Sequence, residues 1–159
     1  MSRAFVKEQD EVPEDLAERP VSANPNIVTE RGLKLIDAAI RASRRALALG
    51  QSQGDKPAIA RALRDLRYWT QRRSTAQLFD PPARLERVGF GTRVTIMRND
   101  HRKQVFSIVG EDESDPPNGY IAYTSPMARA LIGRAEGDVV DIPRGEAEIL
   151  ILEPVGAEG

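Results

Sequence analysis

The chain has 159 residues, of which 40% are hydrophobic, 30% are charged and only 5% are aromatic. It has no cysteine, which excludes disulfides, thiolate metal sites and cysteine nucleophiles. No apolar run approaches the roughly 20 residues of a membrane-spanning helix, and the N-terminus lacks the apolar middle of a signal peptide. We therefore expect a cytoplasmic protein that does not bind membranes.

The net charge of −1 hides a segregation of charge along the chain. Residues 1–28 carry 3 basic and 6 acidic side chains, residues 29–80 carry 11 and 5, and residues 81–159 carry 9 and 13. A basic middle fits a polyanion or an acidic protein surface as a partner. It equally fits a helical face that is well solvated by its charges.

Residues 1–27 are predicted to be a flexible, acidic N-terminal extension. They contain Pro13, Pro20 and Pro25 and almost no periodic apolar residues. Such a segment buries too little apolar surface to offset the entropy lost on ordering.

Residues 28–80 are predicted to form an antiparallel coiled-coil hairpin. Thr29 is a plausible N-cap of the first helix, and Gly50 suits its stop. A six-residue polar turn over 50–55 then leads to Asp55, which caps a second helix that extends to about Leu78. The apolar spacing predicts a narrow seam on both helices, formed by Leu33, Ile36, Ile40, Leu47, Ile59, Leu63 and Leu66.

A two-helix hairpin buries little apolar surface and is marginal alone. Its base is therefore expected to pack against another part of the protein. Tyr68 and Trp69 are the expected contacts there.

Residues 83–156 are predicted to form a small antiparallel sheet with one short helix. Strands are expected over 92–97, 104–110, 119–125, 138–142 and 146–153, and Asn99-Asp100 signals a turn. The helix lies within SPMARALIGRAEGD (125–138), with Ser125 as its cap and Pro126 at its first position. The fold class is α+β.

These motifs resemble the GreA/GreB family of transcript-cleavage factors, and GreB in particular. The resemblance rests on SPMARALIGRAEGD, preceded by GYIAYT and FSIVGEDESD, and on RYWTQRRSTAQLFD (67–80) and NIVTERGLKLI in the hairpin. It covers residues 27–155. It implies a coiled coil followed by an FKBP-like domain, and RNA polymerase as the partner.

In this family the C-terminal domain docks at the rim of the polymerase secondary channel, and the coiled coil enters the pore. Its tip carries a Gly-Asp-x-Ser-Glu-Asn motif, whose acidic pair helps to hold a second Mg²⁺ while the backtracked RNA is hydrolysed. Oxygen ligands of this kind suit a hard cation. The resemblance therefore implies a regulator of transcription elongation.

The tip of this chain departs from that pattern. GQSQGDKP (50–57) has one acid and no Glu, and the arms are shorter than those of GreB by roughly two to three helical turns. Lys56 and Arg61 lie just beyond the tip and would oppose a cation. The turn resembles that of Rnk-like paralogues, which occupy the channel without stimulating cleavage. The predicted hairpin tip is defined by four residues, Gln51, Gln53, Asp55 and Lys56.

The resemblance also implies which residues contact polymerase. Residues 119–134 match the family's docking region, although the family often has Asp or Asn where Thr124 stands, and capping alone also explains Ser125 and Pro126. The predicted contacts are Thr124, Ser125, Pro126 and Arg129. A basic face is predicted on the hairpin, and three interpretations of it stay open: contact with the polymerase pore, contact with RNA or DNA, and simple solvation. The face is formed by Arg41, Arg44, Arg45, Arg61, Arg64 and Arg67.

Other polar clusters favour structural interpretations. Glu111, Asp112, Glu113 and Asp115 are interpreted as a solvated acidic loop, because a Ca²⁺ loop needs regular alternation and a sharp-turn glycine. His101, the only histidine, is interpreted as an exposed turn residue.

We expect a monomer that is not an enzyme and that needs no cofactor or metal. Two rival hypotheses stay open at this point. One is a cleavage factor in which Asp55 alone serves. The other is a peptidyl-prolyl isomerase, which rests only on the implied FKBP-like architecture.

Overall fold

The computed structural model describes residues 16–156, which form two compact units. The first contains residues up to Pro25 and Lys34–Thr75, and the second contains Asn26–Leu33 and residues from Ala76 onward. The part of the predicted extension at 1–15 lies outside the described residues. Across the described residues, none of the helices is long and apolar enough to cross a membrane.

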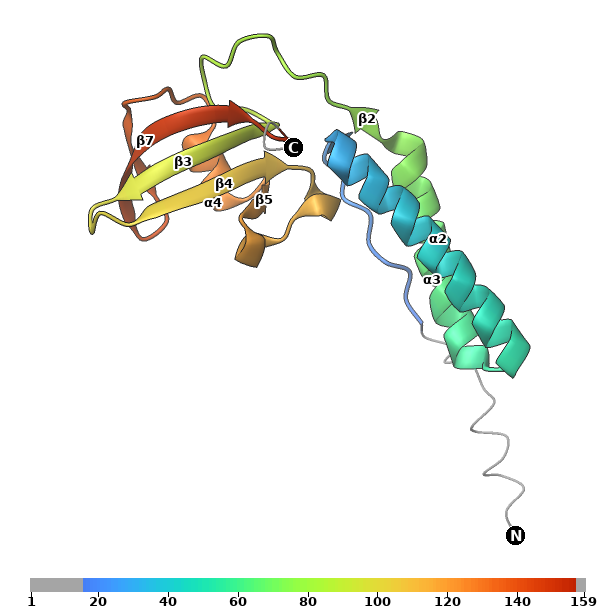
Figure 1. The fold of residues 1–159 in the computed structure, drawn as a ribbon. Coiled ribbons are helices and arrows are strands. Elements are labelled where there is room, and N and C mark those ends of the chain that lie inside the picture. Colours follow the sequence, from blue (N-terminus) through green and yellow to red (C-terminus); the bar gives the residue numbers. More distant parts are fainter. Residues whose placement is uncertain (1–15, 157–159) are drawn as a thin grey trace. The chain divides into compact units, whose positions relative to one another are not determined.

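Most of the first unit is a helical hairpin formed by α2 (Glu30–Gln53) and α3 (Lys56–Thr75), which lie side by side (Figure 1). The first residues of α2, up to Leu33, belong to the second unit. Of the predicted seam, Ile36 is buried on α2, but Leu63 on α3 is 38% exposed and the neighbouring Ala62 is buried instead. Ser43 also faces inward, and its hydroxyl donates to the Ala39 carbonyl at 2.8 Å. A small polar residue in the seam is thus satisfied by its own helix.

The predicted six-residue turn is wrong, because α2 continues to Gln53 and only Gly54 and Asp55 connect the helices. Gly50 lies inside α2 rather than at its end. A side chain there would have its Cβ 3.1 Å from Cγ1 of Ile59 on α3, so glycine permits the close approach of the helices. The left-handed residue that ends α2 is Gly54, with φ +63°.

The second helix is also shorter than predicted. α3 ends at Thr75, and β2 (Gln77–Leu78) follows it and pairs in parallel with β1 (Ile27–Val28). The Gln77 N–H donates to the Asn26 carbonyl, and the Phe79 N–H donates to the Val28 carbonyl, each at 2.8 Å. These backbone bonds with residues distant in the sequence end the helix before Leu78.

The second unit contains a five-stranded sheet of order β5-β4-β3-β7-β6. Its strands are β3 (Thr92–Arg98), β4 (Lys103–Val109), β5 (Tyr120–Ala122), β6 (Val139–Ile142) and β7 (Gly145–Pro154). Neighbours are antiparallel except β4 and β5, which are parallel. The α+β fold class is confirmed, and the expected all-antiparallel pairing is wrong at β5.

The core of this unit lies between the sheet and the short helix α4 (Pro126–Leu131), which covers one face of it (Figure 1). Alternating residues of β3 are buried, which is the period of a strand with one face inward. The largest fully buried side chains of the core are Ile96, Ile108, Leu131, Ile149 and Val94.

Candidate functional site

The hairpin tip is exposed, and its one carboxylate accepts a hydrogen bond from the backbone of α3. Gln51, Gln53, Asp55 and Lys56 are all exposed. Asp55 Oδ1 accepts a hydrogen bond from the Ala58 N–H at 3.1 Å, which is the predicted N-cap of α3. Within residues 16–156 there is no group of three or more His, Asp or Glu side chains that could hold a metal ion. The tip therefore offers a capping carboxylate beside a lysine rather than a set of metal ligands.

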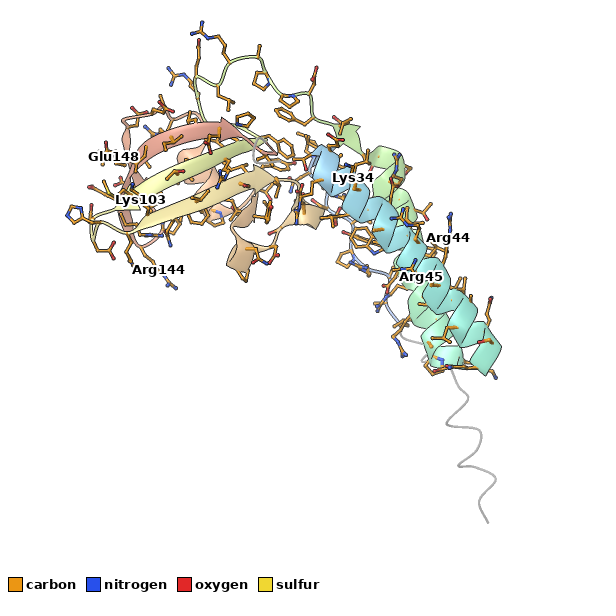
Figure 2. The ribbon with its side chains drawn as sticks, viewed as in Figure 1. Lys34, Arg44, Arg45, Lys103, Arg144 and Glu148 are labelled. Atoms are coloured by element: carbon orange, nitrogen blue, oxygen red, sulfur yellow. The ribbon has the colours of Figure 1, made fainter. Side chains whose placement is uncertain are left out.

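The predicted basic face divides into two parts. Arg41, Arg44, Arg45 and Arg61 are exposed and form no ion pair with any described residue. Figure 2 labels Arg44 and Arg45, which lie next to each other on α2. They supply positive charge that is available to a partner.

The other two arginines of the basic face are paired. Arg64 lies 3.2 Å from the carboxylate of Asp65. Arg67 forms a two-point contact with Glu18, in which its Nε donates to Oε2 at 3.1 Å. The hydrogen bond from Arg67 lowers the pKa of Glu18 below its ordinary value of 4.5. These two side chains are therefore less available to a partner than the other four arginines of the basic face.

Residues 16–19 make contacts with α3 that were not predicted. Arg19 Nη1 lies 3.4 Å from Oδ1 of Asp65, and its guanidinium lies 4.0 Å from the Tyr68 ring centroid and 5.1 Å from that of Trp69. Arg19 of the N-terminal segment thus makes cation–π contacts with the two rings that were expected to pack at the base of the hairpin. A lone arginine among polar residues gives no sequence signal of such a contact.

The loop before α4 holds the predicted docking residues. Ser125 Oγ accepts from the Ala128 N–H at 3.2 Å, so the hydroxyl is committed to capping α4. Pro126 and Arg129 are exposed, and Thr124 is half-buried beside them. The structure thus brings the four residues together and leaves three of them with side chains available at the surface.

The acidic loop is not uniformly solvated, and for Glu113 the prediction is wrong. The Glu113 side chain is only 1% exposed. It accepts a hydrogen bond from the Thr29 hydroxyl at 2.5 Å and one from Arg31 at 2.8 Å, and Arg31 lies 3.9 Å from the Tyr120 ring centroid. Burial of a carboxylate requires such partners.

The predicted N-cap role of Thr29 is confirmed, because its Oγ1 accepts a hydrogen bond from the Gly32 N–H at 3.0 Å. Glu113 thus holds the cap of α2 through the hydroxyl of Thr29. The cluster was not predicted, because its members are far apart in sequence and nothing in the local pattern around Glu113 indicates burial. His101 is exposed, as expected, in the turn between β3 and β4, with φ +63°.

A family model described as "Transcription elongation factor, GreA/GreB, C-term" matches residues 82–153. Transcription elongation factor GreA of Helicobacter acinonychis is 42% identical over 84 residues, which are 50% of this chain and 51% of that protein. Transcription elongation factor GreB of Neisseria meningitidis serogroup B is 42% identical over 93 residues, or 56% of this chain and 57% of that protein.

The chain therefore spans about half the length of the curated relatives that it matches. Among solved structures, the crystal structure of GreA factor homolog 1 (Gfh1) of Thermus thermophilus matches with a TM-score of 0.40 and 17% identity. That match covers 80% of this chain and 97% of the Thermus chain.

Proposed function

We propose that the chain belongs to the GreA/GreB family, whose C-terminal model matches residues 82–153, and that it is a cytoplasmic transcription elongation regulator that binds RNA polymerase without stimulating transcript cleavage. The relatives' names supply the process, transcription elongation. In the proposal, residues 119–134 dock at the rim of the secondary channel and the hairpin enters the pore. The protein acts as a monomer and is not itself an enzyme.

The observation that carries the absence of cleavage is the chemistry of the tip. Family members use an acidic pair to help hold a second Mg²⁺, and such a cation needs several oxygen ligands. Here the only tip carboxylate, Asp55, accepts a hydrogen bond from the Ala58 N–H. The neighbouring Lys56 is exposed and would repel a cation. This tip can occupy a pore but lacks the ligands for the metal.

Binding is supported by two surfaces. Arg129 and Pro126 are exposed next to Thr124 within the matched domain. On the hairpin, Arg44 and Arg45 are exposed positive charges that suit acidic pore walls or the RNA phosphates. Contact with RNA or DNA is part of the proposal for these two residues.

The test is a pull-down with bacterial core RNA polymerase, followed by a cleavage assay on backtracked complexes with an active GreA as positive control. We expect binding at modest salt and no cleavage above the intrinsic rate. Failure to bind would remove the proposal. Cleavage by the parent chain that disappears with Asp55→Ala would instead establish a cleavage factor with an atypical tip.

The docking surface is tested by charge reversal. Arg129→Glu should weaken binding about tenfold or more, because it places like charge against the surface that the arginine faces. Lys103→Glu is the matched control, since Lys103 is exposed on β4 and lies outside the predicted contacts (Figure 2). Equal weakening by both substitutions would show a general charge effect and refute the assigned surface.

A further inference from the structure

Residues 16–25 form a strap, without helix or strand, that lies beside the hairpin in the first unit (Figure 1). Two neighbouring residues of the strap contact α3. Glu18 binds Arg67 at two points, and the guanidinium of Arg19 lies 4.0 Å from the ring centroid of Tyr68. The strap therefore covers both charged and aromatic surface of α3.

The strap is held at the surface of the hairpin and not by its hydrophobic core. None of residues 16–25 is buried. The side chains of Glu18 and Arg67 are 61% and 56% exposed. Ion pairs that are this exposed are weak and are screened by salt. The strap can therefore leave α3 without opening the core of the hairpin.

Release of the strap uncovers side chains of a kind found at protein interfaces. The strap contacts Arg67, Tyr68 and Trp69, and the two rings meet edge to face with their centroids 4.9 Å apart. Arginine, tyrosine and tryptophan are the residue types that most often dominate the binding energy of a protein interface. Glu18 shows which group this surface accepts, because its carboxylate lies on the Arg67 guanidinium. The surface therefore fits a protein partner that presents acidic groups.

We propose that Arg67, Tyr68 and Trp69 are a further contact surface for an acidic protein partner, and that residues 16–25 cover this surface in the free protein. The inference rests on the proposed function, in which that partner is RNA polymerase. The closed strap competes with the partner, because the partner's acidic groups and the Glu18 carboxylate need the same guanidinium. Binding through this surface requires the open form, so the closed fraction lowers the apparent affinity.

Opening of the strap can be measured without polymerase. Trp69 is the only tryptophan of the chain, so acrylamide quenching of its fluorescence reports how far the ring is covered. Glu18→Ala removes the contact with Arg67 and leaves Arg19, the residue over the rings, in place. Quenching should therefore increase about twofold in Glu18→Ala, and it should also increase in the parent chain as salt is raised. Glu146→Ala, at an exposed position outside the strap, is the matched control and should leave the quenching unchanged.

Competition with polymerase is tested by Arg19→Ala in the full-length chain. The substitution removes the contact of the strap with the rings and also one positive charge. If the strap is closed in about three quarters of the molecules, its release raises the apparent affinity for core RNA polymerase about fourfold. The loss of a positive charge alone would instead weaken binding to an acidic surface. Arg84→Ala, which removes a positive charge from an exposed position outside the strap, is the matched control and should not strengthen binding.

Four results decide between the alternatives, and circular dichroism verifies that the helices of each variant are intact. The proposal fails if Arg19→Ala binds polymerase no more tightly than the parent chain does. It also fails if neither Glu18→Ala nor salt changes the quenching of Trp69, because the strap then does not open. A gain in affinity for a single-stranded RNA oligonucleotide but not for polymerase would overturn it by assigning the surface to nucleic acid. Binding of polymerase by neither the parent chain nor Arg19→Ala would refute the proposed function, and quenching alone would then decide whether the strap opens.

Discussion

Substitution of Glu113 by alanine tests the buried cluster at the start of α2. The change removes the acceptor of the Thr29 hydroxyl at 2.5 Å and of Arg31 at 2.8 Å. A hydrogen bond to a buried charged group contributes about 1.5–3 kcal/mol. The Arg31 side chain is 44% exposed, so solvent screening limits its contribution to below about 1 kcal/mol. We expect Glu113→Ala to lower the free energy of unfolding by about 2–3 kcal/mol.

The assay is urea unfolding followed by far-UV circular dichroism. Glu146→Ala is the matched control, because Glu146 is an exposed glutamate of the same unit, and it should change the free energy of unfolding by less than about 0.5 kcal/mol. A change for Glu113→Ala that is as small as that of the control would refute the reasoning about the buried carboxylate.

Gly32 provides a second, independent measure of the same carboxylate. A Cβ at this position would lie 2.7 Å from Oε1 of Glu113. In a free helix, Gly→Ala gains about 1 kcal/mol, but here the alanine must displace a side chain that two partners hold. Gly32→Ala should therefore stabilise only in the Glu113→Ala background, with a coupling energy of about 1 kcal/mol or more. Equal effects in both backgrounds would contradict the geometry.

Three further predictions concern other features. Gly110→Ala would place a Cβ 2.5 Å from a backbone carbonyl of β1 and should cost about 1–3 kcal/mol in unfolding experiments, whereas Gly89→Ala meets no atom within 4 Å and should not destabilise. The pKa of Glu18 is lowered by its hydrogen bond from Arg67, so this pair stabilises the fold above the ordinary pKa of 4.5 and the contribution is lost as the pH falls through the lower folded value. An NMR titration should give a Glu18 midpoint below 4.5 that rises in Arg67→Gln; an unchanged midpoint would exclude the contact in solution. Asp55→Ala should cost about 1 kcal/mol through the lost cap, yet leave transcript cleavage at the intrinsic rate.

Local signals in the sequence were sufficient for the helix N-caps. Thr29, Asp55 and Ser125 each accept the hydrogen bond that their position predicts. Such caps depend on residues three positions away, so a short window of sequence contains all the required information. The strands of the sheet unit were likewise predicted from alternation, within one to three residues at their ends.

Features that depend on distant residues were not predicted. β1 and β2 form only because Ile27–Val28 and Gln77–Leu78 meet across the whole hairpin. The burial of Glu113 depends on Thr29 and Arg31 in the same way. A glycine at position 50 predicts the end of a helix, but its role is to permit the close approach of Ile59, which lies on the facing helix. Of the candidate site, the exposure of the four tip residues agrees with the predicted turn, the docking role of the residues around α4 stays a prediction, and the pairing of Arg64 and Arg67 was not predicted.

Because β1 pairs with β2, the hairpin between them can be replaced by one of another length or tip sequence. The chain enters α2 after β1 and returns from α3 into β2. The distance between these two ends of the hairpin is therefore set by the backbone hydrogen bonds of the strand pair rather than by the length of the helices. Adding seven residues to each arm would extend the hairpin by about 10 Å while keeping the seam in register. Reach and tip chemistry can then vary in evolution or by design without changing where the sheet unit begins and ends.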